Sequence, residues 1–151
     1  MKRSSSVTWH GSGKEGSGKI TTQSKVISSA PYKYATRFGE EKGINPEELI
    51  AAAHASCFTM KLSFVLGEAG HVPELLRTTC TVTMENGTIS ASHLDVGAKV
   101  PGINAADFEK YAEEAKKNCP VSKALNLSIT LSAHLTDETL TEPNEIQKTE
   151  V

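Results

Sequence analysis

One long helix near the middle of the chain constrains this sequence more than any other feature. Its start lies at Asn45-Pro46-Glu47-Glu48. Asn is a favoured N-cap residue, Pro fits the first helical position, and the two carboxylates face the positive end of the helix dipole. The next strong stop signal is Gly70, because Gly commonly ends a helix. The sequence therefore predicts a helix of about 24 residues, ~36 Å long.

The second half of this helix is apolar on nearly every side, with Leu62, Val65 and Ala69 among its residues. A helix on the surface of a globular protein has one apolar stripe and one polar face. We therefore expect this helix to be central and buried.

Extended segments precede the helix. Residues 5–10 and 19–27 have the pattern of two strands, and residues 11–18 form a connector rich in Gly, Ser and Lys. A third extended segment near residues 32–38 completes a predicted N-terminal meander.

A second group of elements follows the helix. Residues 75–84 alternate as a strand, Asn86-Gly87 favours a type I′ turn, and residues 88–100 are predicted to return antiparallel. Asn104 is placed to cap a second helix, and residues 127–135 have the pattern of a last strand.

Strands segregated from helices are typical of the α+β class. We predict a single domain over residues 1–136. Residues 137–151 are polar and have no apolar period, so we expect them to form a flexible tail.

Composition argues against several kinds of partner. The formal net charge is −2 and aromatic residues make up 5% of the chain, which predicts neither a nucleic-acid partner nor an anionic membrane surface. No run of eighteen apolar residues is present, so we expect no membrane span. The N-terminus lacks the apolar core of a secretion signal, which predicts a cytoplasmic protein.

The glycine-rich connector imitates two nucleotide-binding motifs. It matches G-x-G-x-x-G at residues 11–16 and most of a P-loop at residues 13–19. Both motifs need a strand before them and a helix after them, and Ile20 stands where a P-loop needs Ser or Thr. We interpret the connector as a mobile hairpin tip.

The chain has three cysteines, Cys57, Cys80 and Cys119. In a reducing compartment cysteine pairs are more often catalytic or metal-binding than structural. The spacing shows no C-x-x-C and no paired zinc knuckle, so no metal site is predicted. Cys80 falls on the apolar face of its strand, where a small buried side chain is the plain interpretation.

The other two cysteines differ in their local surroundings. Cys57 lies in the middle of the long helix, so on residue type alone an inert buried thiol is favoured, and a reactive one needs a cation from elsewhere. Cys119 precedes Pro120, which places it at the cap of a short helix where backbone N–H groups favour a thiolate. His54 shares a helix face with Cys57. A packed helix histidine is favoured there over a Cys–His pair or half a metal site.

Two separated motifs resemble the osmotically inducible protein C (OsmC) family, a sibling of the organic hydroperoxide resistance proteins. The first is TRFGEEKG at residues 36–43 continuing into NPEELIAAAHASCF at residues 45–58. The second is VPGI at residues 100–103, followed by a helix and CPVS at residues 119–122. The resemblance covers roughly residues 7–135.

This resemblance implies a cysteine peroxidase that reduces organic hydroperoxides, and hydrogen peroxide less well. It implies that Cys57 is oxidised to a sulfenic acid and that Cys119 condenses with it to a disulfide. It further implies that Arg37 and Glu47 hold the Cys57 thiolate, although the adjacent Glu48 is an alternative partner for the arginine.

The family fold consists of antiparallel sheets around a long central helix in an intertwined homodimer, with the active sites at the interface. The resemblance implies no resident cofactor and no metal. The disulfide needs an external dithiol reductant, for which the sibling family suggests a lipoylated protein.

The spacing of Glu47 and Cys57 adds one inference. Ten helical residues separate two side chains by ~15 Å along the axis, so one arginine cannot easily contact both within one chain. We therefore predict that Arg37 and Glu47 reach Cys57 from a second copy of the chain, or that the helix breaks between residues 47 and 57.

The substrate pocket for an organic peroxide is expected to be partly apolar. Phe38, Phe58 and Met60 flank the key residues and are candidates for it, with ordinary dimer core as the alternative. Two other functions stay open at this point: a non-enzymatic thiol sensor or ligand-binding dimer, and a Cys–His hydrolase or acyltransferase that uses His54.

Overall fold

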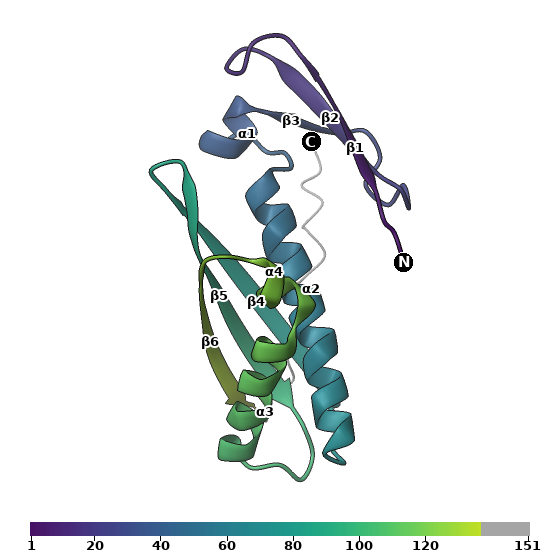
Figure 1. Ribbon diagram of the computed structural model, residues 1–151, viewed down its shortest axis with the longest axis vertical. Helices are drawn as coiled ribbons and strands as arrows, with labels where there is room; N and C mark the ends of the chain where they lie inside the picture. Colours follow the sequence, from purple (N-terminus) through teal and green to yellow (C-terminus); the bar gives the residue numbers. More distant parts are fainter. Residues whose placement is uncertain (137–151) are drawn as a thin grey trace, which may run out of the picture. The chain divides into compact units, whose positions relative to one another are not determined.

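The computed structural model describes residues 1–136 (Figure 1). The predicted tail, residues 137–151, lies outside the described residues. The chain divides into two compact units, Met1–Ile50 and the residues from Ala51 onward. Each unit contains one three-stranded sheet, so the predicted α+β class is confirmed.

The first unit contains the antiparallel sheet β1-β2-β3. Its strands are β1 (Ser5–His10), β2 (Ser17–Thr22) and β3 (Ala30–Lys33). Gly18 of β2 pairs with both Trp9 and Tyr32, whose ring centroids lie 5.1 Å apart. A side chain at residue 18 would collide with both rings, which explains the glycine. The glycine-rich connector joins β1 to another strand, so the helix that both nucleotide motifs require is not there.

Two strand predictions in this unit were too long. β2 ends at Thr22, whose hydroxyl accepts a hydrogen bond from the backbone N–H of Ile27 at 3.2 Å and closes a turn. The extended segment predicted near residues 32–38 is wrong in its second part, where the short helix α1 (Tyr34–Phe38) forms. The Thr36 hydroxyl accepts from the N–H of Lys33 at 3.0 Å and donates to its carbonyl at 2.9 Å, which closes the first turn of α1.

The long helix α2 (Pro46–Glu68) forms as predicted. Asn45 caps it, because its side-chain oxygen accepts from the N–H of Glu48 at 2.8 Å. At the other end Gly70 has φ +85°, and the N–H of His71 donates to the carbonyl of Leu66 at 2.8 Å. These are the features of a helix that ends in a left-handed glycine.

The second unit contains the sheet β4-β5-β6. Its strands are β4 (Leu75–Glu85), β5 (Thr88–Lys99) and β6 (Ser128–Leu135). The predicted hairpin turn is confirmed, since Asn86 and Gly87 both have positive φ, 51° and 76°.

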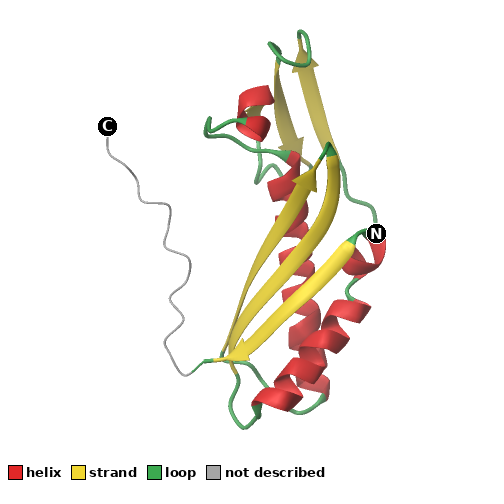
Figure 2. Ribbon diagram, turned by 90° about the vertical axis from the view of Figure 1, so that its left-hand side faces the viewer, coloured by secondary structure: helices red, strands yellow, loops and turns green. Residues whose placement is uncertain are grey.

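The prediction of antiparallel sheets is wrong for one strand pair, because β6 runs parallel to β5. The connection between them passes through α3 (Ala105–Asn118) and α4 (Pro120–Ala124). A helical crossover of this kind brings the next strand back in the same direction as the first. Figure 2 shows the second half of α2 and α3 on the same face of this sheet.

The core of the second unit lies between that face and the two helices. The fully buried side chains from the two helices and β5 include Phe58, Leu62, Leu66, Leu94, Val96 and Phe108. Complete burial of each of these side chains stabilises the fold by about 1.5–3 kcal/mol.

The prediction that α2 is buried on nearly every side is wrong for one face. Met60 is 66% exposed and Phe64 is 61% exposed. The sheet and α3 cover only the opposite face of the helix, where Phe58 and Leu62 lie. Of the helices in residues 1–136, α2 alone is long and apolar enough to cross a membrane by length and composition. A core helix meets the same criterion, and one side of α2 packs in the core.

Candidate active site

The fold brings Cys57 and Cys119 together. Cys57 lies on α2, half-buried beside the core, and Cys119 lies fully buried between α3 and α4. Asn118 ends α3 and Pro120 begins α4, so Cys119 is the N-cap residue of α4 in extended backbone geometry. The two thiols are free, and each shifts the pKa of the other.

Their surroundings favour the thiolate at Cys119. Burial raises the pKa of Cys57, a contact with the Val121 backbone lowers it, and the hydrogen bond with Cys119 raises it further. At Cys119 burial also acts to raise the pKa. Hydrogen bonds from the backbone and hydroxyl of Ser122, from Cys57 and from the Val121 backbone outweigh burial, so the net direction is downward. In one copy of the chain, Cys57 therefore lacks the group that would make it a strong nucleophile.

A second pair, Arg37 and Glu47, forms within the first unit. Arg37 Nε lies 3.0 Å and 3.2 Å from the two carboxylate oxygens of Glu47, and Nη2 lies 2.7 Å from Oε1. The hydrogen bond from Arg37 is the main cause that lowers the pKa of Glu47, against the opposing effect of burial. Glu48 instead accepts from the side chain of Asn45 at 3.1 Å, so Glu47 is the partner of the arginine.

The two pairs belong to different units of the chain, the ion pair to Met1–Ile50 and the cysteines to the residues from Ala51 onward. The helix that carries Glu47 and Cys57 is continuous from Pro46 to Glu68. The alternative prediction of a break between residues 47 and 57 is therefore wrong.

The three predicted pocket residues lie in different surroundings. Phe38 is 50% exposed, and its ring centroid lies 5.0 Å from Cζ of Arg37. Phe58 is fully buried in the core. Met60 lines a groove of about 740 Å³ between α2 and β4, with Ala52, Ser56 and Leu76 among its other residues.

His54 is also fully buried, and its two ring nitrogens bind two serine hydroxyls. Nδ1 lies 2.7 Å from Ser92 Oγ, and Nε2 lies 2.8 Å from Ser122 Oγ. The packed helix histidine is therefore confirmed. Since both nitrogens are engaged by serines, the geometry does not favour a Cys–His hydrolase. Among the described residues no group of three His, Cys, Asp or Glu side chains could hold a metal ion.

Sequence reasoning missed Ser92 and Ser122. Ser92 lies on the inward face of β5, in the same alternation as Leu94 and Val96. A serine at an apolar position of that kind needs a hydrogen-bond partner, and this signal could have indicated the contact with His54.

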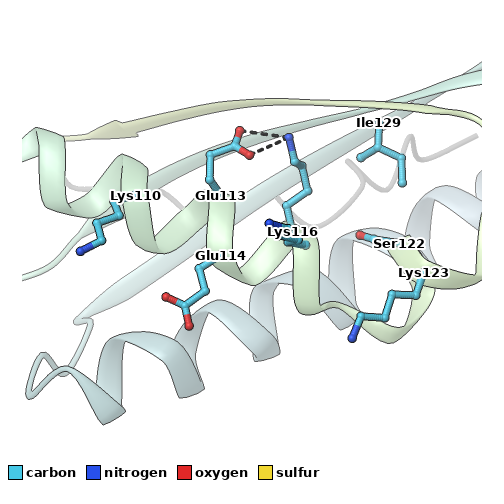
Figure 3. A pocket seen from close by; sticks show the side chains of 8 residues that line it. Lys110, Glu113, Glu114, Lys116, Ser122, Lys123 and Ile129 are labelled. Atoms are coloured by element: carbon cyan, nitrogen blue, oxygen red, sulfur yellow. Dashed lines mark hydrogen bonds and ion pairs between the residues drawn. The ribbon is translucent and has the colours of Figure 1, made fainter.

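On its outer side Ser122 lines a pocket of about 660 Å³ (Figure 3). The other lining residues come from α3, α4 and β6: Lys110, Glu113, Glu114, Lys116, Lys117, Lys123 and Ile129. Lys116 forms an ion pair with Glu113 at 2.8 Å. The pocket is therefore lined mostly by charged side chains, and the hydroxyl of Ser122 connects it to the buried His54.

Comparison with known proteins gives a consistent result. The family model described as OsmC-like protein matches residues 39–134. The chain is 44% identical over 131 residues to peroxiredoxin OsmC of Escherichia coli strain K12. The aligned region covers 84% of this chain and 92% of that protein. It is 33% identical over 129 residues to organic hydroperoxide resistance protein-like 1 of Staphylococcus saprophyticus. This aligned region covers 80% of this chain and 89% of that protein.

Solved structures show the same fold. The OsmC-like protein from Mycoplasma pneumoniae superposes with a TM-score of 0.71 at 13% identity, over 90% of this chain and 98% of that one. An organic hydroperoxide resistance protein from Elizabethkingia anophelis, crystallised with thiocyanate, superposes with a TM-score of 0.67 at 22% identity, over 90% and 99% of the two chains.

Proposed function

The chain belongs to the OsmC-like protein family, and from that premise we propose that it is a cysteine peroxidase that reduces organic hydroperoxides, and hydrogen peroxide less well. The observation that carries this proposal is the pair of free thiols, Cys57 and Cys119, which are near enough to shift each other's pKa. Cys57 is half-buried and Cys119 is fully buried, so only the first is placed to meet a substrate from solution.

In the first step the Cys57 thiolate attacks the distal oxygen of the hydroperoxide. A sulfur–oxygen bond forms, the oxygen–oxygen bond breaks, and an alkoxide leaves and takes up a proton to become the alcohol. The peroxide gains two electrons and Cys57 becomes a sulfenic acid.

In the second step the Cys119 thiolate attacks the sulfur of this sulfenic acid. The disulfide forms, hydroxide leaves, and protonation converts it to water. An external dithiol then supplies two electrons: one thiolate opens the disulfide as a mixed disulfide, and its second thiol releases the protein. We place this cycle in the cytoplasm, where such reductants keep thiols reduced.

The first step needs a cation, because burial raises the pKa of Cys57 in a single copy of the chain. We assign that role to Arg37 of a second copy, with Glu47 holding the guanidinium in orientation. A guanidinium can both favour the thiolate and donate hydrogen bonds to the peroxide oxygens.

Exposed apolar surface supports the association of two copies of the chain. The exposed face of α2 carries Met60 and Phe64, and the groove between α2 and β4 is lined mostly by small and apolar side chains. An apolar helix face of this kind is typical of an interface between subunits. Phe38 and Met60 then belong to the part of the interface that binds the organic group of the peroxide.

The test is consumption of cumene hydroperoxide under steady state with dihydrolipoamide as reductant, combined with mass spectrometry after one equivalent of peroxide. We expect multiple turnovers and a Cys57–Cys119 disulfide. Cys80→Ser serves as the matched cysteine control and should keep the disulfide. Oxidation that stops after one equivalent, with reductant present, would show a thiol sensor instead of an enzyme.

A further inference from the structure

A chain of five side chains, the first four of them joined by hydrogen bonds, runs through the core of the second unit. We call it the His54 chain, and in order it consists of Cys80, Ser92, His54, Ser122 and Cys119. Cys80 Sγ lies 3.2 Å from Ser92 Oγ, and His54 lies 2.7 Å from Ser92 Oγ and 2.8 Å from Ser122 Oγ. Ser122 lies in the first turn of α4, which Cys119 caps, and its hydroxyl is one of the groups that lower the pKa of Cys119. The chain therefore links the resolving cysteine to the third cysteine through one imidazole.

The protons in this chain can be arranged in only two ways. Burial lowers the pKa of His54, so the ring is neutral and has one N–H donor and one acceptor nitrogen. Each serine has a single proton to donate. If Nε2 carries the proton, it donates to Ser122, and the Ser122 hydroxyl is then free to donate to Cys119. If Nδ1 carries it, Ser92 donates toward Cys80, and Ser122 must donate back to the ring.

The first arrangement gives the Cys119 thiolate the Ser122 hydroxyl as a donor, and the second leaves Ser122 without a proton to donate to it. The first arrangement also keeps Cys80 as a thiol that donates to Ser92, which in turn donates to Nδ1. This agrees with the raised pKa of Cys80, for which burial is the main cause. All buried side-chain nitrogen and oxygen atoms among the described residues have a hydrogen-bond partner, so the buried ring of His54 and the two serine hydroxyls are all satisfied.

We propose that His54 is a positioning residue of the peroxidase: in its Nε2–H tautomer it directs the Ser122 hydroxyl at the sulfur of Cys119. His54 acts through Ser122 and does not contact the substrate. Since neither nitrogen gains or loses a proton, no buried imidazolium forms.

This inference rests on the proposed function and gives Cys119 two tasks within it. As a thiolate it attacks the sulfur of the Cys57 sulfenic acid. When the disulfide is reduced, the same hydrogen bond stabilises Cys119 as the leaving thiolate, so the reductant attacks the sulfur of Cys57. The burial of the two residues also favours attack of the reductant on Cys57, because Cys119 has no exposed surface and Cys57 is only half-buried.

Other titratable groups surround the His54 chain. Any experiment has to distinguish their effect on the pKa of Cys119 from that of His54. Cys57 on α2 lowers the pKa of Cys119, and Cys80 on β4 lies 3.9 Å from His54 Nδ1. The pocket outside Ser122 carries charged side chains of α3 and α4: Lys110, Glu113, Glu114, Lys116, Lys117 and Lys123. For this reason each cysteine must be titrated individually.

Nuclear magnetic resonance on the intact reduced protein provides the test. The ¹³Cβ shifts of the three cysteines give a separate pKa for each thiol. The ¹⁵N shifts of His54, recorded where Cys119 is ionised, report which ring nitrogen is protonated. We expect protonated Nε2 and unprotonated Nδ1. The opposite tautomer, or a protonated ring, would overturn the proposal without any mutation.

Variants then measure the effect. We expect Ser122→Ala to raise the pKa of Cys119 by about one to two units, the value of a hydrogen bond to a charged group. Disulfide formation after one equivalent of peroxide should slow about tenfold or more at neutral pH. His54→Leu should act in the same direction, and His54→Gln, whose amide can both donate and accept, should recover part of the loss.

Two control residues lie on the same sheet but do not belong to the His54 chain. His93, which bonds Thr130 in an exposed position, is changed to Gln, and the exposed Ser128 is changed to Ala. Neither should move the pKa of Cys119. An unchanged pKa in Ser122→Ala would refute the inference even if the protein is an active peroxidase. Absence of turnover in the wild type, with the predicted tautomer and pKa shift intact, would refute the proposed function alone.

Discussion

Two nitrogens of Arg37 donate to the carboxylate of Glu47: Nη2 lies 2.7 Å from Oε1, and Nε lies 3.0 Å from Oε1 and 3.2 Å from Oε2. α1 supplies the arginine and the first turn of α2 supplies the carboxylate. The guanidinium is thus held in one orientation by a group that belongs to the start of the long helix.

Glu47→Gln should lower kcat/KM for cumene hydroperoxide about tenfold or more, because the neutral amide holds the guanidinium less firmly. The matched control is Glu48→Gln, since Glu48 bonds Asn45 and not the arginine. Equal activity in the Glu47 and Glu48 variants would contradict the assignment. The measurement is initial rates over a range of peroxide concentrations with saturating reductant.

The same ion pair predicts a change of stability in acid. The pKa of Glu47 is lowered from its ordinary value of 4.5 in the folded chain. The ion pair therefore contributes its full stabilisation to the folded chain above pH 4.5. This contribution is lost as the pH falls through the pKa that Glu47 has in the folded state, which is lower. Because Arg37 is partly exposed, the effect is small, about 0–1 kcal/mol.

Urea unfolding at neutral pH and at pH values below 4.5 checks this sign. Glu47→Gln should lower the free energy of unfolding at neutral pH and leave little difference from the wild type at the acid end. If the difference in free energy of unfolding between the two proteins grows toward low pH, the Arg37–Glu47 ion pair does not stabilise the fold.

Mixed dimers should show whether the active site is shared between copies. We expect Cys57→Ser and Arg37→Ala to be almost inactive as separate preparations. When they are unfolded together and refolded, heterodimers should regain activity, because one site then combines an intact Cys57 with an intact Arg37. No recovery, with heterodimers present by native mass spectrometry, would mean that both residues act within one copy.

Cys119→Ser should stop the cycle at the sulfenic acid. Without the resolving thiol, Cys57 is expected to react with dimedone after one equivalent of peroxide and to proceed to sulfinic acid with an excess. Peptide mass spectrometry identifies both products. A rate of turnover with dihydrolipoamide equal to that of the wild type would instead mean that the external thiol resolves Cys57 directly.

Met60→Asp should weaken the association of two copies while leaving each copy folded. Met60 is 66% exposed in the single chain, so the change costs little there, but a charge buried in an interface without a partner is unfavourable. Light scattering coupled to size exclusion, with circular dichroism as the folding control, measures both effects. Met60→Leu is the matched apolar variant and should remain associated.

Local signals in the sequence were sufficient for most elements of the fold. The cap at Asn45, the turn at Asn86-Gly87 and the cap at Asn104 each depend on a few neighbouring residues, and the structure contains all three. The position of Cys119 before Pro120 likewise predicted its place at the start of α4.

Features that depend on distant parts of the chain could not be predicted in the same way. Hydrophobic alternation identifies β6 as a strand but carries no information on its direction relative to β5. The contact of His54 with Ser122 joins residues 68 positions apart, and only the packing of α4 against α2 creates it. The ion pair of Arg37 with Glu47 came from the family resemblance and not from any periodicity.

The proposed Cys57–Cys119 disulfide would change the stability of the fold. Cys57 and Cys119 stand 62 positions apart in the chain (119 − 57 = 62), and β4, β5 and α3 lie between them. Tying the ends of a loop of that length restricts the unfolded chain by about 4 kcal/mol in the chain-entropy treatment. The oxidised form would therefore resist heat and proteolysis better than the reduced form, and each catalytic cycle would gain and then lose this stabilisation.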